Sequence, residues 1–302
     1  MTESKIAVVT GAAGFIGSHM VDLLLDNGYK VRGIDNLARG RLENLANCKS
    51  NPNLVFEARD LRDMEADDST FREAEFIFHF AGIPDVVPSI DHPTEYLSAN
   101  VMSTVHVLEG ARNAGVRKFV YAASSSCYGL AKEIPTTEQS EICPQYPYAL
   151  SKYMGEEVVM HWGQIYHLPV IAMRIFNAYG PRARTTGAYG SVFGVFLAQK
   201  LAGKPFTVVG DGSQSRDFIF VTDIAKAFLE AAVSKQDNEI YNLGGGAPQT
   251  INRIVELLGG DVVNMPKRPG EPDCTWADIS KIQSHLKWAP VVSFQDGVAT
   301  ML

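Results

Sequence analysis

The sequence has few cysteines, no long apolar run and no excess of positive charge. Its four cysteines show no Cys-x-x-Cys spacing, which argues against a zinc site or a disulfide framework, so no metal is expected. No apolar run approaches the roughly 20 residues that span a bilayer. The start, MTESKIAVVTGAAG, lacks the basic and apolar regions of a signal peptide. We therefore expect a soluble protein of a reducing compartment, most simply the cytoplasm, with no membrane partner.

Charge and length set further bounds. The net charge of −7 argues against a nucleic-acid partner, because a sequence-independent nucleic-acid surface is strongly basic. Apolar residues make up 46% of the 302 residues, which is enough for a full core. This length allows one large α/β domain, or one domain with a smaller lobe.

Short β-branched runs alternate with helical patterns along the chain as far as about residue 176. The expected strands are 5–10, 29–35, 54–58, 75–80, 117–123 and 169–175. Helical patterns follow several of them, as at 17–28 and 95–115, and this alternation favours a parallel sheet covered by helices. After residue 176 the order is less regular, with expected strands at 206–210 and 239–244 and helices at 191–202, 222–233, 250–258 and 279–286.

A glycine-rich turn joins the first strand to the first helix. In TGAAGFIGSH, Gly11 permits a tight turn, Gly14 lets the backbone approach a diphosphate, and Gly17 lets helix and strand pack closely. The helix then directs its free N–H groups at the phosphates. Asp35 closes the second strand, where an acid can bind the adenosine ribose and repel a 2′-phosphate, so we expect NAD rather than NADP. The alternative is that Asp35 caps a loop, and three nearby arginines keep NADP open: Arg32, Arg39 and Arg41.

Tyr148 and Lys152 are four residues apart in PQYPYALSKYMGEE. On a helix both side chains lie on one face, one turn apart. An adjacent ammonium favours the phenolate, so it would lower the pKa of the phenol. A phenolate that forms near neutral pH can act as a base. From this spacing alone, a surface tyrosine and a solvated lysine remain the alternative.

Seven motifs follow one another in a recognisable order. They are TGAAGFIG (10–17), HFAG (79–82), ASSSCYG (123–129), YALSK (148–152), RIFNAYGPR (174–182), GDGSQSRDFIFVTD (210–223) and RPGEPDCTWADISK (268–281). With them the chain resembles the extended short-chain dehydrogenase/reductase family from about residue 5 to about 296, and more closely its NAD-dependent UDP-hexose 4-epimerases. The resemblance implies an α/β fold: a Rossmann-type doubly wound parallel sheet with a smaller C-terminal substrate-binding lobe. Residues 1–175 would form the NAD-binding domain, to which about 217–245 returns, and 176–302 would mainly form the lobe.

The resemblance also implies a set of residues that bind NAD. Asp60 and Leu61 should flank the adenine, Phe80 and Ala81 should line the cofactor path, and Asn100 should lie in the central helix. Without the resemblance, Asp60 would be interpreted as a helix cap, and Phe80 and Ala81 as ordinary core residues of a strand. The full set is Gly11, Gly14, Phe15, Ile16, Gly17, Asp35, Asn36, Asp60, Leu61, Phe80, Ala81, Gly82, Asn100, Tyr148 and Lys152.

By the same resemblance Ser124, Tyr148 and Lys152 are the catalytic set. Tyr148 would take the proton of the sugar's 4-hydroxyl, Lys152 would keep Tyr148 ionised, and Ser124 would bind the same oxygen, so that carbon 4 is inverted through a 4-keto sugar. The UDP-sugar would be bound by Ser124, Ser125, Ser126, Tyr148, Asn177, Arg216, Arg268, Glu271 and Thr275. The alternative is that these arginines pair with Asp217 or Glu271 on the surface.

Related enzymes give the competing interpretations. A 4,6-dehydratase needs an Asp and a Glu directly after the catalytic serine, where this chain has Ser125 and Ser126. Cys127 reads as a packing residue. Arg182 and Arg184 leave a carboxylated sugar open, as in a UDP-glucuronate 4-epimerase. A non-catalytic NAD-binding regulator is the distant alternative, which would lack the Tyr or the Lys.

The sugar and the assembly are the finest expectations. By resemblance, VVPS (86–89) and TTGAYGSVF (185–193) are typical of members that act on N-acetylated or other modified UDP-hexoses. The small Thr275, which by the same resemblance faces the sugar's 2-substituent, would leave room for an N-acetyl group. The helices at 95–115 and 148–167 carry apolar residues on more than one face, so a homodimer joined through a four-helix bundle is expected. These residues are Met102, Val105, Val107, Val158, Val159, Met160 and Trp162.

Overall fold

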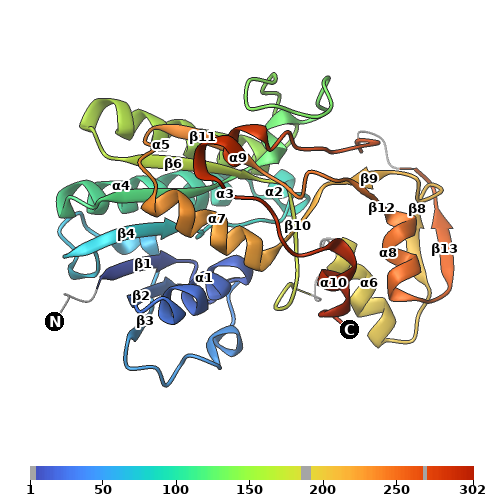
Figure 1. Ribbon diagram of the computed structural model, residues 1–302, viewed down its shortest axis with the longest axis horizontal. Helices are drawn as coiled ribbons and strands as arrows, with labels where there is room; N and C mark the ends of the chain where they lie inside the picture. Colours follow the sequence, from blue (N-terminus) through green and yellow to red (C-terminus); the bar gives the residue numbers. More distant parts are fainter. Residues whose placement is uncertain (1–4, 185–191, 268–270) are drawn as a thin grey trace.

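The computed structural model describes residues 5–184, 192–267 and 271–302. Its centre is a seven-stranded sheet in the order β11-β6-β5-β4-β1-β2-β3, in which every neighbouring pair is parallel (Figure 1). The strands are β1 (Ile6–Thr10), β2 (Lys30–Asp35), β3 (Leu54–Ala58), β4 (Ala74–His79), β5 (Lys118–Ser124), β6 (Val170–Ile175) and β11 (Glu239–Leu243). The predicted fold class is confirmed. The strand order reverses between β1 and β4, where doubly wound sheets bind ligands.

Two helical layers cover the sheet because its strands are apolar on both faces. Val8 of β1 packs with α4 (Ser103–Ala114) and α5 (Pro147–Tyr166), whereas its neighbours Ala7 and Val9 pack with α1 (Phe15–Asp26) and α7 (Val221–Val233). Successive side chains of a strand point to opposite faces, so one short run serves both cores. Pro147 occupies the first turn of α5, a favoured position for proline.

The helix expected at 95–115 is divided. A short helix α3 (Pro93–Leu97) is followed by a π-helical turn, η4 (Ser98–Met102), and then by α4. Single π-turns inside helices are frequent at functional sites. Here the turn carries the buried Asn100.

A smaller lobe lies beside the sheet, at the right of Figure 1. Its helices are α6 (Val192–Leu201), α8 (Ile251–Leu258) and α10 (Phe294–Ala299), and its parallel strand pair is β8 (Phe206–Val209) with β13 (Val262–Met265). Its core is aromatic, with Tyr179 stacked on Phe193 at a ring-centroid distance of 5.0 Å. The sequence analysis missed β13 because its four residues are all exposed and polar Asn264 interrupts them.

Two more short strand pairs lie outside the central sheet, and one further helix packs against it. β7 (Asn177–Tyr179) pairs with β10 (Phe218–Phe220), β9 (Ser215–Arg216) pairs with β12 (Gln249–Thr250), and α9 (Ser280–Leu286) contacts β11. Because β11 pairs with β6, part of the chain beyond residue 176 lies in the central sheet. The division into residues 1–175 with about 217–245, and a lobe of 176–302, stays our proposal.

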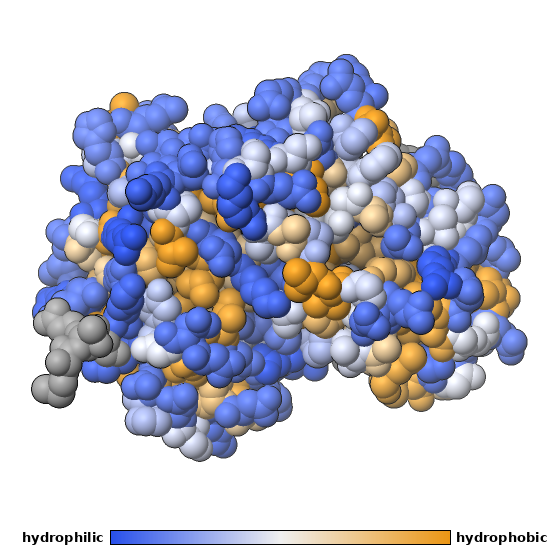
Figure 2. Space-filling model, in the orientation of Figure 1, coloured by the Kyte–Doolittle hydropathy of each residue, from blue (hydrophilic) through white to orange (hydrophobic). Residues whose placement is uncertain are grey.

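Polar side chains cover most of the face in Figure 2, with apolar residues in separate patches. Among the described helices, none is both long enough and apolar enough to cross a membrane.

Candidate active site

The glycine turn lies between β1 and α1. Gly11 has φ of +68°, and a Cβ there would lie 2.8 Å from the amide nitrogen of Ala81. Gly14 is the N-cap of α1, and a Cβ on Gly17 would overlap the carbonyl oxygen of Gly11. Only glycine fits these close approaches. The turn therefore leaves the N–H groups at the start of α1 open to a diphosphate.

A cavity of about 300 Å³ opens beside this turn at the carboxyl ends of β1, β2 and β4. Most of the predicted cofactor residues line it: Gly11, Gly14, Phe15, Ile16, Gly17, Asp35, Asn36, Asp60, Leu61, Phe80, Ala81 and Gly82. The lining combines a glycine cradle with apolar side chains and carboxylates at one end, which fits a dinucleotide. Asn100, Tyr148 and Lys152 do not line this cavity.

Asp35 has two roles in the structure. Its carboxylate accepts hydrogen bonds from the amide of Ala13 at 3.0 Å and from that of Leu37 at 2.8 Å, so it caps the loop as well as lining the cavity. Burial raises its pKa, against these backbone hydrogen bonds. Arg39 and Arg41 also line the cavity, whereas Arg32 donates to the carbonyls of residues 69, 70 and 72.

Asp60 is both a helix cap and a cavity residue. It caps the short helix η2 (Leu61–Asp63) and accepts a hydrogen bond from Asn36 Nδ2 at 2.8 Å. The Arg62 guanidinium pairs with it at 2.8 Å and holds the pKa of this carboxyl well below its usual range. Asn36 and Asp60 thereby join the ends of β2 and β3 at the side of the cavity where the adenosine is expected.

Asn100 positions the loop after β4. Its Oδ1 accepts from the amide of Ile83 at 2.7 Å, and its Nδ2 donates to Ser151 Oγ at 2.9 Å. A Cβ on Gly82 would approach Asn100 Oδ1 to 2.8 Å. The side chain therefore connects the loop at 82–84 to α5.

Ser124 and Tyr148 meet at the carboxyl end of the sheet. β5 ends at Ser124, α5 begins one residue before Tyr148, and the tyrosine hydroxyl lies 3.4 Å from Ser124 Oγ. Ser124 Oγ is also 2.8 Å from Ser126 Oγ. Ser126 and the neighbouring Ser125 belong to the short helix η5 (Ser125–Tyr128), which follows Ser124. The structure thus brings together a phenol and a hydroxyl that can bind one oxygen atom.

Lys152 lies one turn further along α5 and is 7% exposed. Its ammonium is 4.3 Å from the centroid of the Tyr121 ring, a cation–π distance. Burial lowers the pKa of Lys152 to about 7, while the Glu156 carboxylate acts in the opposite direction. Tyr121 was missed in the sequence because an aromatic residue in a buried strand looks like ordinary core.

The expectation that the pKa of Tyr148 lies below that of a free phenol is wrong for the protein alone. The pKa of Tyr148 is raised, because burial outweighs the hydrogen bond to Ser124, which lowers it. A buried phenol loses the water that would stabilise its phenolate. The ammonium of Lys152 is itself partly discharged near neutral pH, which weakens its support for the phenolate.

The expected UDP-sugar residues gather between the sheet and the lobe. Arg216 Nη2 pairs with Glu271 Oε1 at 2.9 Å, rather than with Asp217. Glu271 lines a second cavity of about 200 Å³. Asn177 Nδ2 donates to Thr275 Oγ1 at 3.1 Å, so Thr275 orients Asn177 whatever else it does.

Some predicted positions fall elsewhere. Arg268 and residues 185–191 of the TTGAYGSVF motif lie outside the described residues. Cys127 is buried among Tyr128, Phe176 and Ala277, and burial raises its pKa to about 12, in keeping with a packing role. The first cavity is also lined by residues that the sequence analysis did not select, including Ile83, Pro84, Glu95 and Ala99.

Known proteins resemble this chain over almost its whole length. The family described as GDP-mannose 4,6 dehydratase matches residues 8–301. The UDP-glucose 4-epimerase of Mycolicibacterium smegmatis is 36% identical over 304 residues, covering 97% of this chain and 96% of the relative. A solved UDP-N-acetylglucosamine 4-epimerase from Methanobrevibacter ruminantium M1, in complex with UDP-N-acetylmuramic acid, is similar with a TM-score of 0.92, 33% identity and coverage of 100% and 99%. The UDP-glucuronic acid 4-epimerase from Bacillus cereus, in complex with UDP-glucuronic acid and NAD, has a TM-score of 0.89, 32% identity and coverage of 98% and 97%.

Proposed function

The chain belongs to the GDP-mannose 4,6 dehydratase family of extended short-chain dehydrogenases/reductases, and from this premise we propose that it is an NAD-dependent enzyme that inverts carbon 4 of a UDP-hexose. The observation that carries the proposal is the 3.4 Å hydrogen bond between Tyr148 and Ser124 with Lys152 one turn away. This arrangement lies at the edge of the sheet where the glycine-lined cavity opens.

Each of the three side chains has one task. Tyr148 removes the proton of the 4-hydroxyl, with an expected contribution of roughly 10²–10⁴-fold to the rate. Ser124 donates to the same oxygen and then to the ketone, and Lys152 supplies positive charge beside the phenolate. NAD would be held at the N–H groups of Phe15 and Ile16, since the Gly14 amide already donates to the carbonyl of Gly11, and it would supply the hydride chemistry at carbon 4. The 4-keto sugar turns over in the site, so reduction on its other face inverts the carbon.

The family also contains dehydratases, and the turn after Ser124 argues against that activity here. Elimination of water across carbons 5 and 6 needs an additional acid and base. Ser125 and Ser126 stand where those carboxyl groups would be, and a serine hydroxyl does not serve this purpose at neutral pH.

A UDP-glucuronate 4-epimerase is the second candidate, favoured by one observation. Arg184 lines the first cavity, and its Nη1 is 3.4 Å from Asp85 Oδ2, so a cation is available for a sugar carboxylate. The similarity to the Bacillus cereus enzyme supports this alternative. Asp85 already neutralises Arg184 in part, which makes a neutral sugar the better fit.

For the leading proposal we favour N-acetylated sugars, with plain hexoses as further substrates. Thr275 is small and half-buried beside Asn177, which leaves room next to the sugar. The UDP moiety would lie against Asn177, Arg216 and Glu271, with Arg268 as a further proposed contact. Arginine suits a diphosphate because its planar group makes paired contacts.

The direct test is a panel of UDP-sugars incubated with the protein and NAD, with products identified by NMR. We expect UDP-N-acetylglucosamine and UDP-N-acetylgalactosamine to interconvert. Turnover of UDP-glucuronate alone would replace the leading proposal with the second candidate. Release of water to a 4-keto-6-deoxy product would identify a dehydratase instead.

We also propose a homodimer and a cytoplasmic location. On α5, one stripe of side chains faces outward at helical spacing: Leu150, Met154, Glu157, His161 and Ile165 are all exposed. Met102, on the neighbouring π-turn, is 50% exposed. Three of these α5 residues are apolar, and such a stripe is typical of a contact between subunits.

A further inference from the structure

A buried ion pair joins α5 to the middle of the sheet. Arg174 of β6 donates from Nε to Glu156 Oε2 at 2.9 Å and from Nη2 to Glu156 Oε1 at 2.6 Å. Their side chains are only 4% and 1% exposed. Burying two charges is costly, and an apolar pair of similar volume is often as stable or more so. Stability alone therefore does not explain why charges are kept here.

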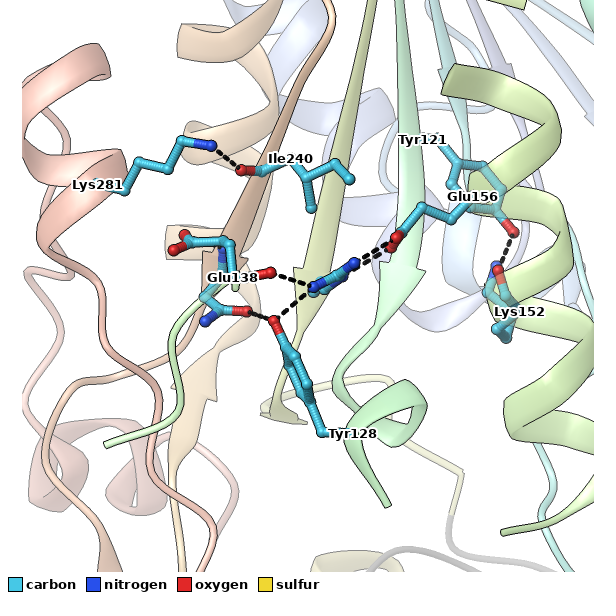
Figure 3. Close-up of polar contacts among 9 residues, drawn as sticks. Tyr121, Tyr128, Glu138, Lys152, Glu156, Ile240 and Lys281 are labelled. Atoms are coloured by element: carbon cyan, nitrogen blue, oxygen red, sulfur yellow. Dashed lines mark hydrogen bonds and ion pairs between the residues drawn. The ribbon is translucent and has the colours of Figure 1, made fainter. Parts of the chain in front are cut away.

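The same guanidinium binds two further segments. Its Nη1 donates to the Tyr128 hydroxyl at 2.8 Å and to the carbonyl of Glu138 at 3.1 Å. The Tyr128 hydroxyl in turn donates to Asn242 Oδ1 of β11 at 2.7 Å. Figure 3 shows the side chains of Glu156 and Tyr128 extending from α5 and from η5 towards the same buried group of hydrogen bonds.

These segments are the ones that carry the reacting groups. Tyr128 ends η5, the turn that begins directly after Ser124, and Glu156 lies on the helix that presents Tyr148 and Lys152. Arg174 thus fixes the distance between the serine turn and α5. In enzymes generally, a misplacement of about 1 Å at the reacting groups can cost about 10²-fold in rate.

Glu156 also lies one turn beyond Lys152 on α5. The other groups that face Lys152 are His79 of β4, Tyr121 of β5 and Tyr148 of α5. His79 is neutral because burial, and then the charge of Lys152, lower its pKa to about 3. The phenol of Tyr121 is also neutral, because burial raises its pKa. Glu156 is therefore the group in this set that supports the ammonium.

We propose that Glu156 and Arg174 are positioning residues for the epimerisation: Arg174 holds the serine turn against α5, and Glu156 favours the charged form of Lys152 against the effect of burial. This inference rests on the proposed function for its effect on turnover. The effect on the charge of Lys152 is independent of any substrate.

The first experiment measures the titration of Lys152 in NAD-free protein. Lysine is labelled with ¹³C at Cε, and the Lys152 signal is assigned by its loss in Lys152→Met. Glu156→Gln keeps the shape of the side chain without its charge, and we expect the Lys152 midpoint to move to lower pH. Asp223→Asn removes another fully buried carboxylate, which binds the amides of residues 291 and 292 instead, and should leave the midpoint unchanged.

The second experiment separates geometry from charge by turnover. Arg174→Lys keeps the charge, but its single nitrogen cannot reproduce the four hydrogen bonds that Arg174 makes to Glu156, Tyr128 and Glu138. We expect kcat to fall about tenfold to a hundredfold, with the Lys152 midpoint near that of wild type. Tyr128→Phe should lower kcat in the same sense.

A double variant covers the case in which a single variant does not fold. Glu156→Leu with Arg174→Met replaces the pair by apolar side chains and leaves no charge unpaired. A lowered Lys152 midpoint and slowed turnover in the folded double variant support the proposal. A wild-type Lys152 midpoint in both Glu156 variants overturns the role proposed for Glu156. A wild-type kcat in Arg174→Lys overturns the role proposed for Arg174. If the wild-type protein turns over no UDP-sugar, the proposed function fails, and the Lys152 titration still decides the role of Glu156.

Discussion

At the scale of single residues, the site depends on Tyr148 and Lys152, whose pKa values burial shifts in opposite directions. Burial raises the pKa of the Tyr148 phenol and lowers that of the Lys152 ammonium to about 7, so both charged forms are disfavoured in the protein alone. In a low dielectric, the neutral form of each group has the lower free energy. A charged ligand bound beside them would change this balance, which makes the site responsive to its occupant.

Tyr148→Phe should reduce turnover by roughly 10²–10⁴-fold, because the base is lost while the ring still packs. Binding of the UDP-sugar, measured by calorimetry, should remain close to that of wild type. Tyr153→Phe is the matched control, since it removes a hydroxyl from a half-buried tyrosine of the same helix that lies beside Glu157. Near wild-type turnover of Tyr148→Phe would refute the assigned mechanism.

The depressed pKa of Lys152 also affects stability. Between about pH 7 and 10.5 the unfolded chain holds more protons at this group than the folded protein does, so the free energy of unfolding rises with pH across this window. Lys152→Met removes the cost of burying the charge. In NAD-free protein we expect the variant to be the more stable at pH 7, with the difference shrinking towards pH 10.5. Urea unfolding at both pH values measures this, and a difference that does not change with pH would contradict it.

Thr275 has two proposed effects, one through its small size and one through its hydrogen bond with Asn177, and two variants separate them. Thr275→Tyr should selectively reduce activity on UDP-N-acetylglucosamine relative to UDP-glucose, because overpacking costs about 1–3 kcal/mol. Thr275→Val keeps the volume but removes the acceptor for Asn177, so it should affect both sugars alike. Parallel kcat/KM measurements on the two sugars give the comparison. Equal losses in Thr275→Tyr would rule out the size gate.

At the scale of elements, the turn from β1 to α1 is the most constrained. Gly17→Ala would push a Cβ into the carbonyl of Gly11, so we expect a lower Tm and weaker NAD binding by calorimetry. Gly28→Asn at the far end of α1 is the control, since φ there is +78°, no atom lies within 4 Å of a Cβ, and asparagine tolerates this conformation. If Gly17→Ala bound NAD like wild type, close packing at this turn would not be what shapes the cavity.

At the scale of the whole molecule, the exposed stripe of α5 predicts the assembly. Met154→Glu combined with Ile165→Glu places two charges in the proposed subunit contact, so light scattering at micromolar concentration should give a monomer where wild type gives a dimer. Leu201→Glu on α6 is the control, because that side chain is 83% exposed and lies on the lobe. A wild-type protein that is already monomeric would refute the dimer.

The sequence by itself determined the local elements and the candidate residues. The glycine spacing requires the turn between β1 and α1, because no other residue fits there. Short runs rich in apolar and β-branched residues predict the strands of a parallel sheet, and all six expected before residue 176 are present. These features depend on neighbours a few residues apart, which a single sequence displays directly.

Only the tertiary structure decided the partners and charges of the site. Arg216 pairs with Glu271, 55 residues away, and Glu156 with Arg174 across the interface of helix and sheet. The charge in VIAMRI was visible as an arginine in an apolar strand, but its partner was not. The pKa shifts of Tyr148 and Lys152 likewise depend on how deeply the fold buries them. Electrostatic free energies are set by burial and by contacts between distant segments, and neither is encoded in the spacing of residues along the chain.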